Sequence, residues 1–135
     1  MIYSLKMWQK IKTLKEAQAL IQKDQDKLAQ TTHLKAVDSI KLIAQFMLEE
    51  QVELSEGCIR IKVLLDHVAP ELHDQTPFTV FSEMYDATEH MPTHGARKRA
   101  DKALIRKLDA ERFELEKNHK DAIIKASKAL RNYSF

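Results

Sequence analysis

The chain has 135 residues, which suits one domain of ordinary size and leaves little room for two. Its formal net charge is +2, and 44 % of its residues are hydrophobic, a share that excludes an intrinsically disordered protein. Two glycines and three prolines are too few for the tight turns of a β-sandwich or barrel. No apolar run is long enough for a transmembrane helix or a secretory signal, and a single cysteine excludes an internal disulfide, so we expect an all-α, cytoplasmic protein.

The charges are segregated along the chain. Residues 1–35 hold seven bases and three acids (+4), residues 36–94 three bases and eleven acids (−8), and residues 95–135 twelve bases and six acids (+6). The basic ends either fold against the acidic middle of the chain or attract phosphate from RNA or anionic lipid.

Residues 1–34 are predicted to form an amphipathic heptad helix. Polar residues occupy its alternate core positions, Gln18 and Gln25, which lowers stability but fixes register or partner number. Trp8 lies off the seam among three lysines, so we expect it to pack on a neighbouring helix or, alternatively, to anchor the helix at a membrane surface. The seam itself is narrow and typical of a coiled coil, because apolar residues recur every seven positions: Met7, Leu14, Ile21 and Leu28, with Ile11 beside them.

Residues 35–135 are predicted to form a helical core domain. Thr31 and Thr32 either cap its first helix or only interrupt one continuous helix, which ends near residues 49–51. Ser55 is the expected N-cap of the next helix. From Ile59 to Val68 this helix is apolar on nearly every side, so we expect it to be central and buried.

Prolines divide the rest of the chain. Pro70 ends the buried helix, residues 69–76 form a loop, and Thr76 with Pro77 predicts the start of another helix. Pro92 ends that helix, and a long amphipathic helix is predicted over residues 97–131, where neither proline nor glycine occurs. These patterns predict about five helices, with short buried central helices packed with two long amphipathic terminal ones.

His90 and His94 flank a proline and form the densest histidine cluster. Two imidazoles around a rigid turn, with Glu53, Glu56 or Glu89 nearby, would supply ligands for zinc or iron. Under the alternative, one imidazole hydrogen-bonds the carbonyls at a helix end and the other caps or packs at the next helix start. We expect the structural role, with no metal and no other cofactor.

Cys58 stands three residues after Ser55, near the positive end of a helix dipole, which would favour a thiolate and, with a nearby histidine, a thiol enzyme. A cysteine in an apolar helix more often acts as a small buried hydrophobe. No pattern marks an oxyanion hole or a Ser-His-Asp arrangement, and two glycines exclude a phosphate-binding glycine loop.

Basic residues provide two candidate anion sites. Arg60, between two isoleucines, is expected to be at least partly buried in an ion pair with Glu50, Glu53 or Glu89, or else to face a cleft and bind an anion. Neither base-reading aromatic residues nor a helix-turn-helix pattern is present, which argues against sequence-specific DNA binding. On one helix, six further bases would track the phosphates of RNA or anionic lipid, although such a run is more often a solvated face: Arg97, Lys98, Arg99, Lys102, Arg106 and Lys107.

Four stretches within residues 35–131 stand out together: Ser39-Ile40…Ile43-Ala44-Gln45, Glu56-Gly57-Cys58-Ile59-Arg60-Ile61, Leu64-Leu65-Asp66 and His90-Met91-Pro92-Thr93-His94. They resemble a small family of uncharacterised bacterial helical proteins, the domain of unknown function numbered 2489. The resemblance implies no assigned activity. Members of that family often begin with a membrane-spanning segment, whereas residues 1–22 here are too charged to span a membrane. If the motifs mark one site, its candidate members are Glu56, Cys58, Arg60, His90 and His94.

These observations favour a non-enzymatic interaction or adaptor module that binds a protein partner, or itself, through its long helices. One alternative is a small metal-dependent or thiol enzyme that uses His90, His94 and Cys58. Another is binding of RNA or anionic lipid phosphate through the basic terminal helices, with a peripheral location at the inner membrane.

Overall fold

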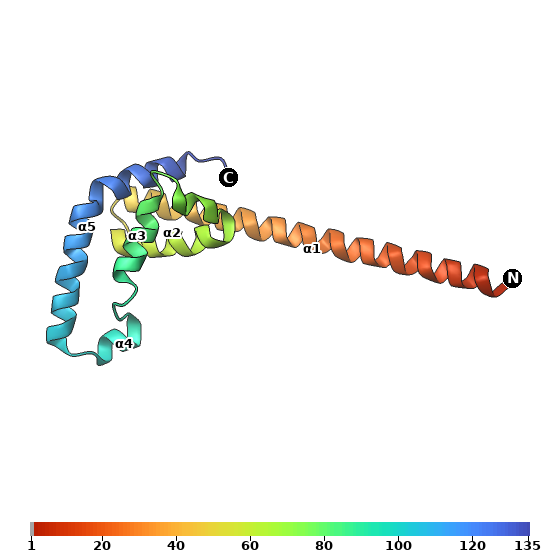
Figure 1. Ribbon diagram of the computed structural model, residues 1–135, viewed down its shortest axis with the longest axis horizontal. Coiled ribbons are helices and arrows are strands. Elements are labelled where there is room, and N and C mark those ends of the chain that lie inside the picture. Colours follow the sequence, from red (N-terminus) through yellow and green to blue (C-terminus); the bar gives the residue numbers. More distant parts are fainter. Residues whose placement is uncertain (1) are drawn as a thin grey trace. The chain divides into compact units, whose positions relative to one another are not determined.

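The structure is a computed structural model that describes the backbone of residues 2–135 and the side chains of residues 4–135 (Figure 1). Met1, the first residue of the predicted heptad helix, lies outside the described residues. Within the described residues no strand occurs, and the first and last helices are long while those between them in the sequence are shorter, so the predicted fold class is confirmed. The elements are α1 (Ile2–Leu48), α2 (Leu54–Val68), the 3-10 helix η1 (Pro70–Asp74), α3 (Thr79–Thr88), α4 (His94–Arg99) and α5 (Lys102–Arg131).

Helix α1 continues through Thr31 and Thr32. Their hydroxyls donate to the carbonyl oxygens of Lys27 and Leu28 at 2.9 and 3.0 Å, a bond that lets threonine stay inside a helix. The alternative in which the threonines cap a second helix is therefore wrong. The chain divides into two compact units, residues up to Lys35 and residues 36–135, and α1 contributes to both. No helix within the described part of the chain combines the length and apolar character needed to cross a bilayer.

The end of α1 is closed by a backbone motif. The N–H of Glu50 donates to the carbonyl of Met47 at 3.2 Å, and the N–H of Gln51 donates to that of Phe46 at 2.8 Å. These two bonds are those of a Schellman motif, which needs a left-handed residue after the helix. Glu50 fills that position with φ 59°, although it carries a side chain.

Replacing Glu50 with glycine is expected to raise the free energy of unfolding by about 0.5–1 kcal/mol. A left-handed L-residue costs about 1–2 kcal/mol, and the greater chain entropy that glycine loses on folding offsets only part of that gain. Chemical denaturation of the two proteins measures the difference. Glu49→Gly provides the control, because Glu49 is equally exposed but its φ is not positive, and this variant should be less stable.

The core of the unit 36–135 lies where the last turns of α1 meet α2, α3 and the second half of α5 (Figure 1). Helix α2 buries one face only, since Val63 is 44 % exposed while Ile59 and Leu64 are half-buried. The prediction that α2 is buried on nearly every side is therefore wrong. The largest fully buried apolar side chains come from every element of this unit except α4: Ile40, Ile61, Leu65, Leu72, Phe81, Met84, Ile123 and Leu130.

Three element boundaries in the structure differ from the predicted ones, each for a physical reason. The N-cap of α2 is Glu53, because the hydroxyl of Ser55 is buried and donates to Glu116 Oε1 at 2.8 Å instead of capping. The expected loop 69–76 contains η1, which buries Leu72, and residues 76–78 form a turn before α3. The predicted helix over 97–131 is broken at residues 100–101, whose backbones are extended (ψ 156° and 135°), so that α4 and α5 are separate helices.

Candidate functional site

Two of the four motif stretches meet at one cavity of about 440 Å³, which we call the motif pocket. The stretch in α2 contributes Glu56 and Arg60, and the connection after α3 contributes residues 91–94. Apolar side chains line it together with charged ones, the combination usual for a small-molecule site. The apolar lining consists of Ile59, Met91, Pro92, Ile105 and Leu108.

The charges around the motif pocket are paired with one another. Arg97 donates from both Nη atoms to the two carboxylate oxygens of Asp109 at 2.7 Å, and this hydrogen bonding lowers the pKa of Asp109. Arg112 lies 3.5 Å from Glu53 and 3.8 Å from Asp109. Because each arginine faces a carboxylate, the pocket as a whole has no strong preference for an anion or a cation.

Arg60 is exposed, with 58 % of its side chain accessible, and donates to Glu56 Oε1 at 2.7 Å. The prediction of a buried arginine paired with Glu50, Glu53 or Glu89 is therefore wrong. The reason is the orientation of α2, which turns Ile61 into the core and leaves its neighbour Arg60 in solvent beside the motif pocket. An exposed pair spaced by four residues on a helix contributes only about 0.3–0.5 kcal/mol.

Cys58 is fully buried in the core. Burial, and secondarily the negative charge of Glu116, raises the pKa of its thiol to about 12. The expected role as a small buried hydrophobe is therefore confirmed, and the alternative of a thiolate is wrong, because desolvation outweighs the helix dipole.

The two candidate histidines, His90 and His94, lie in different surroundings. His94, the first residue of α4, lines the motif pocket with a left-handed backbone (φ 47°), whereas His90 is exposed and does not line it. Thr93, not a histidine, is the N-cap of α4, so of the two predicted roles at this helix start capping is wrong and packing stays a prediction. No group of three or more His, Cys, Asp or Glu side chains in the described residues is placed to hold a metal ion, so nothing there supports the alternative of a zinc or iron site.

A hydrogen-bonded Ser-His-Asp chain, which the sequence did not reveal, joins α2, η1 and α3. His73 Nε2 lies 2.8 Å from Asp66 Oδ1, and His73 Nδ1 lies 3.0 Å from Ser82 Oγ. Two features indicate that these hydrogen bonds hold the three helices together and that Ser82 is not a nucleophile. Asp66 is shared with Lys62 at 2.8 Å, and Ser82 lies inside α3, where neighbouring backbone N–H groups are used by the helix and cannot form an oxyanion hole.

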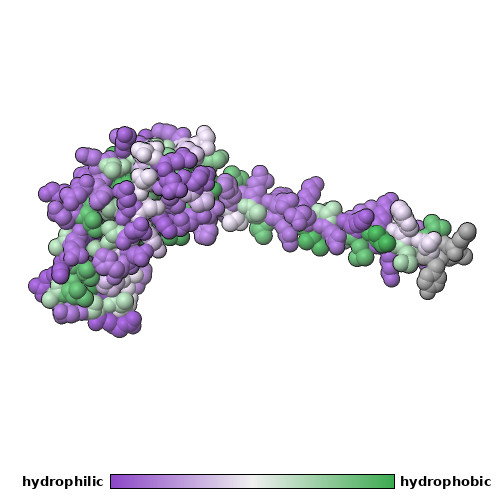
Figure 2. All heavy atoms as spheres, in the orientation of Figure 1, coloured by the Kyte–Doolittle hydropathy of each residue, from purple (hydrophilic) through white to green (hydrophobic). Residues whose placement is uncertain are grey.

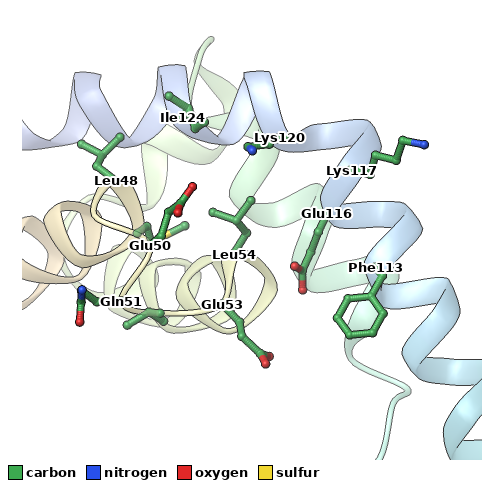
Figure 3. Close-up of a pocket in the computed structure, with 12 residues that line it drawn as sticks. Leu48, Glu50, Gln51, Glu53, Leu54, Phe113, Glu116, Lys117, Lys120 and Ile124 are labelled. Atoms are coloured by element: carbon green, nitrogen blue, oxygen red, sulfur yellow. The ribbon is translucent and has the colours of Figure 1, made fainter.

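A second groove, of about 530 Å³, lies between the connection from α1 to α2 and a bend in α5 (Figure 3). Figure 3 places Phe113 and Lys117 on one arm of the bend and Lys120 and Ile124 on the other. Between these arms in the sequence, His119 Nδ1 lies 2.9 Å from the carbonyl oxygen of Leu115, the kind of side-chain contact that can bend a helix. Nothing about this groove favours one kind of ligand.

The six predicted anion-binding bases do not share one helix face, because the break at residues 100–101 separates them. The prediction that one helix carries all six bases is therefore wrong. Four of the six bases line one concavity of about 540 Å³ between α4 and the first turns of α5, together with His94, Ala100 and Ile105, whereas Arg99 and Lys107 do not line it. We call it the basic hollow: Arg97, Lys98, Lys102 and Arg106 are its cationic members.

The chain belongs to the family described as protein of unknown function DUF2489, which it matches over residues 1–130. It is similar to an uncharacterised protein of Haemophilus influenzae, with 28 % identity over 126 residues that cover 90 % of this chain and 80 % of that protein. No solved structure matches the chain significantly. The resemblance seen in four stretches is confirmed, and the match extends from the core domain into the N-terminal helix.

Proposed function

We propose that this member of the family is a non-enzymatic association module that pairs with a second copy of itself through the seam of residues 7–28. The observation that carries the proposal is the exposure of the seam. Every apolar seam residue is between 48 % and 68 % exposed, and Figure 2 displays apolar residues among hydrophilic ones along this helix. The seam residues are Met7, Ile11, Leu14, Ile21 and Leu28.

The spacing of the seam favours another helix as its partner. A strict interval of seven residues over several turns is shorter than two turns of a straight helix, so it follows a left-handed supercoil. A helix that lies on a membrane surface instead presents a broad apolar face at the 3.6-residue period. Lysines border the seam, but its apolar width is that of a coiled coil.

The polar seam positions favour an identical, parallel partner. In a parallel pair in register, Gln18 meets Gln18 and Gln25 meets Gln25, so each amide has a hydrogen-bonding partner. In an antiparallel pair these glutamines would face leucine or isoleucine and leave buried amides without partners, which costs about 1–3 kcal/mol each. Self-pairing thus explains why polar residues occupy the alternate positions.

The net charge of this segment gives the pairing a distinctive salt dependence. Residues 1–35 carry +4, so two parallel copies repel each other at low ionic strength. We therefore expect added salt to strengthen self-association. Binding of the same basic helix to an acidic protein, RNA or anionic lipid would be weakened by salt instead.

The test is the mass of the full chain in solution, measured by sedimentation across protein and salt concentrations. Replacing Leu14 and Ile21 with aspartate should raise the dissociation constant by about a hundredfold or more, because each copy loses two buried apolar contacts and gains two seam charges. The matched control replaces Leu20 and Leu34, which are 65 % and 57 % exposed on the opposite face of the helix, also with aspartate. This control changes charge and helix propensity equally and should leave the mass unchanged.

Three results would contradict self-pairing: a monomer at every concentration, equal loss of association in both double variants, or an association that salt weakens. The last result would point to an anionic partner in place of a second copy.

A further inference from the structure

We infer that the basic hollow between α4 and α5 is a binding site for a phosphate-bearing anion, a role separate from the proposed self-pairing. The break between the two helices creates the hollow. Because Ala100 and Asp101 are extended, the chain turns between α4 and α5, and Lys98 on one side faces the same concavity as Lys102 and Arg106 on the other. On a continuous helix these bases, spaced by four residues, would lie along one convex face and would not surround a hollow.

Within the described residues, three of the four bases that line the hollow are not neutralised by a carboxylate. Lys98, Lys102 and Arg106 are exposed and have no ion-pair partner within residues 4–135, and no acidic side chain lines the hollow in that part of the chain. Three like charges around one concavity raise the local positive potential, and a multiply charged anion relieves their mutual repulsion. Nearby Asp101 is exposed but is not part of the lining.

Arg97 has a different part in the hollow. Its guanidinium is held by two hydrogen bonds of 2.7 Å to Asp109, so its charge is largely balanced while its position is fixed. It therefore acts as a rigid wall between the basic hollow and the motif pocket, both of which it lines. The free cations that attract the ligand are the other three.

The lining selects phosphate over other anions. Lysine and arginine donors around a concavity suit the several oxygens of a phosphate group, and three free cations exceed what a single carboxylate requires. No Phe, Tyr or Trp side chain lines the hollow within the described residues, so beside the His94 imidazole there is little surface on which a nucleic-acid base would stack. The volume of about 540 Å³ suits a small ligand or a lipid headgroup that carries one or two phosphates.

The experiment titrates the full chain with inorganic pyrophosphate by calorimetry at low salt. In parallel it measures cosedimentation with phosphatidylcholine vesicles, with and without phosphatidylglycerol. The test variant replaces Lys98, Lys102 and Arg106 with alanine. The control variant replaces three exposed lysines outside the hollow, Lys107, Lys125 and Lys128, with alanine, so that both variants lose the same net charge.

We expect saturable binding that weakens by about tenfold or more in the test variant and stays within about twofold in the control variant. Binding of pyrophosphate alone identifies a free phosphate compound as the source, and binding of anionic vesicles that pyrophosphate displaces identifies a lipid headgroup. Absence of both kinds of binding would overturn the inference. Equal weakening in the two variants would also overturn it, because general charge attraction would then suffice.

Discussion

Raising the pH from about 9 to 12 is expected to lower the free energy of unfolding by up to about 4 kcal/mol through Cys58 alone. The buried thiol has a pKa of about 12, against 9.0 for an exposed one. Between these values the unfolded chain releases the thiol proton while the folded chain keeps it, so each pH unit favours the unfolded state by about 1.4 kcal/mol. Below pH 9 both states hold the proton and Cys58 contributes no pH dependence.

The measurement is denaturant unfolding at several pH values, compared between the native chain and a Cys58→Ala variant. The variant should be less stable near pH 8, because it leaves a small cavity, and the difference should shrink as the pH rises. Other groups titrate equally in both proteins and cancel in the difference. Parallel pH curves, or a thiol that reacts with a water-soluble reagent in the folded protein at pH 8, would contradict the burial of Cys58.

Replacing Gly57 with alanine is expected to lower the free energy of unfolding by about 1–3 kcal/mol. A Cβ atom at this position would overlap the Sδ and Cγ atoms of Met47, a residue in the last turn of α1. Met47 is only 2 % exposed and is enclosed by the core, so it cannot swing into solvent to make room. Thermal or denaturant unfolding measures the loss.

Gly95 provides the matched control for the same substitution. A Cβ there would meet only the Arg99 guanidinium at 3.8 Å, so Gly95→Ala should be neutral or stabilising by up to about 1 kcal/mol. The double variant Met47→Ala with Gly57→Ala should lose less free energy of unfolding than the sum of the losses in the two single variants, because the smaller side chain makes room for the new Cβ. Strict additivity, or equal effects at the two glycines, would contradict the close approach.

Local signals account for what the sequence predicted of the fold. Scarce glycine and proline, together with seven-residue and 3.6-residue periodicity, depend on neighbouring residues only, and they correctly indicated an all-α chain with long terminal helices. The family resemblance singled out Glu56, Arg60 and His94, which do lie around one pocket, but it also included Cys58 and His90, which do not. A motif records proximity in sequence and does not state which side of a helix faces the core.

Tertiary contacts decided the remainder, because they join residues that are distant in sequence. Ser55 does not cap α2 since its hydroxyl bonds Glu116, 61 positions away, and Arg60 is exposed since packing turned Ile61 inward. The spacing of four residues already places Lys98, Lys102 and Arg106 on one helix face, but the concavity that they line depends on a break at residues 100–101 that neither proline nor glycine marks. By itself, the sequence determined the helices and their apolar seams. The choice of which polar side chains are buried, paired or gathered required the packing of helices against one another, since the energies that decide it come from burial and from partners far along the chain.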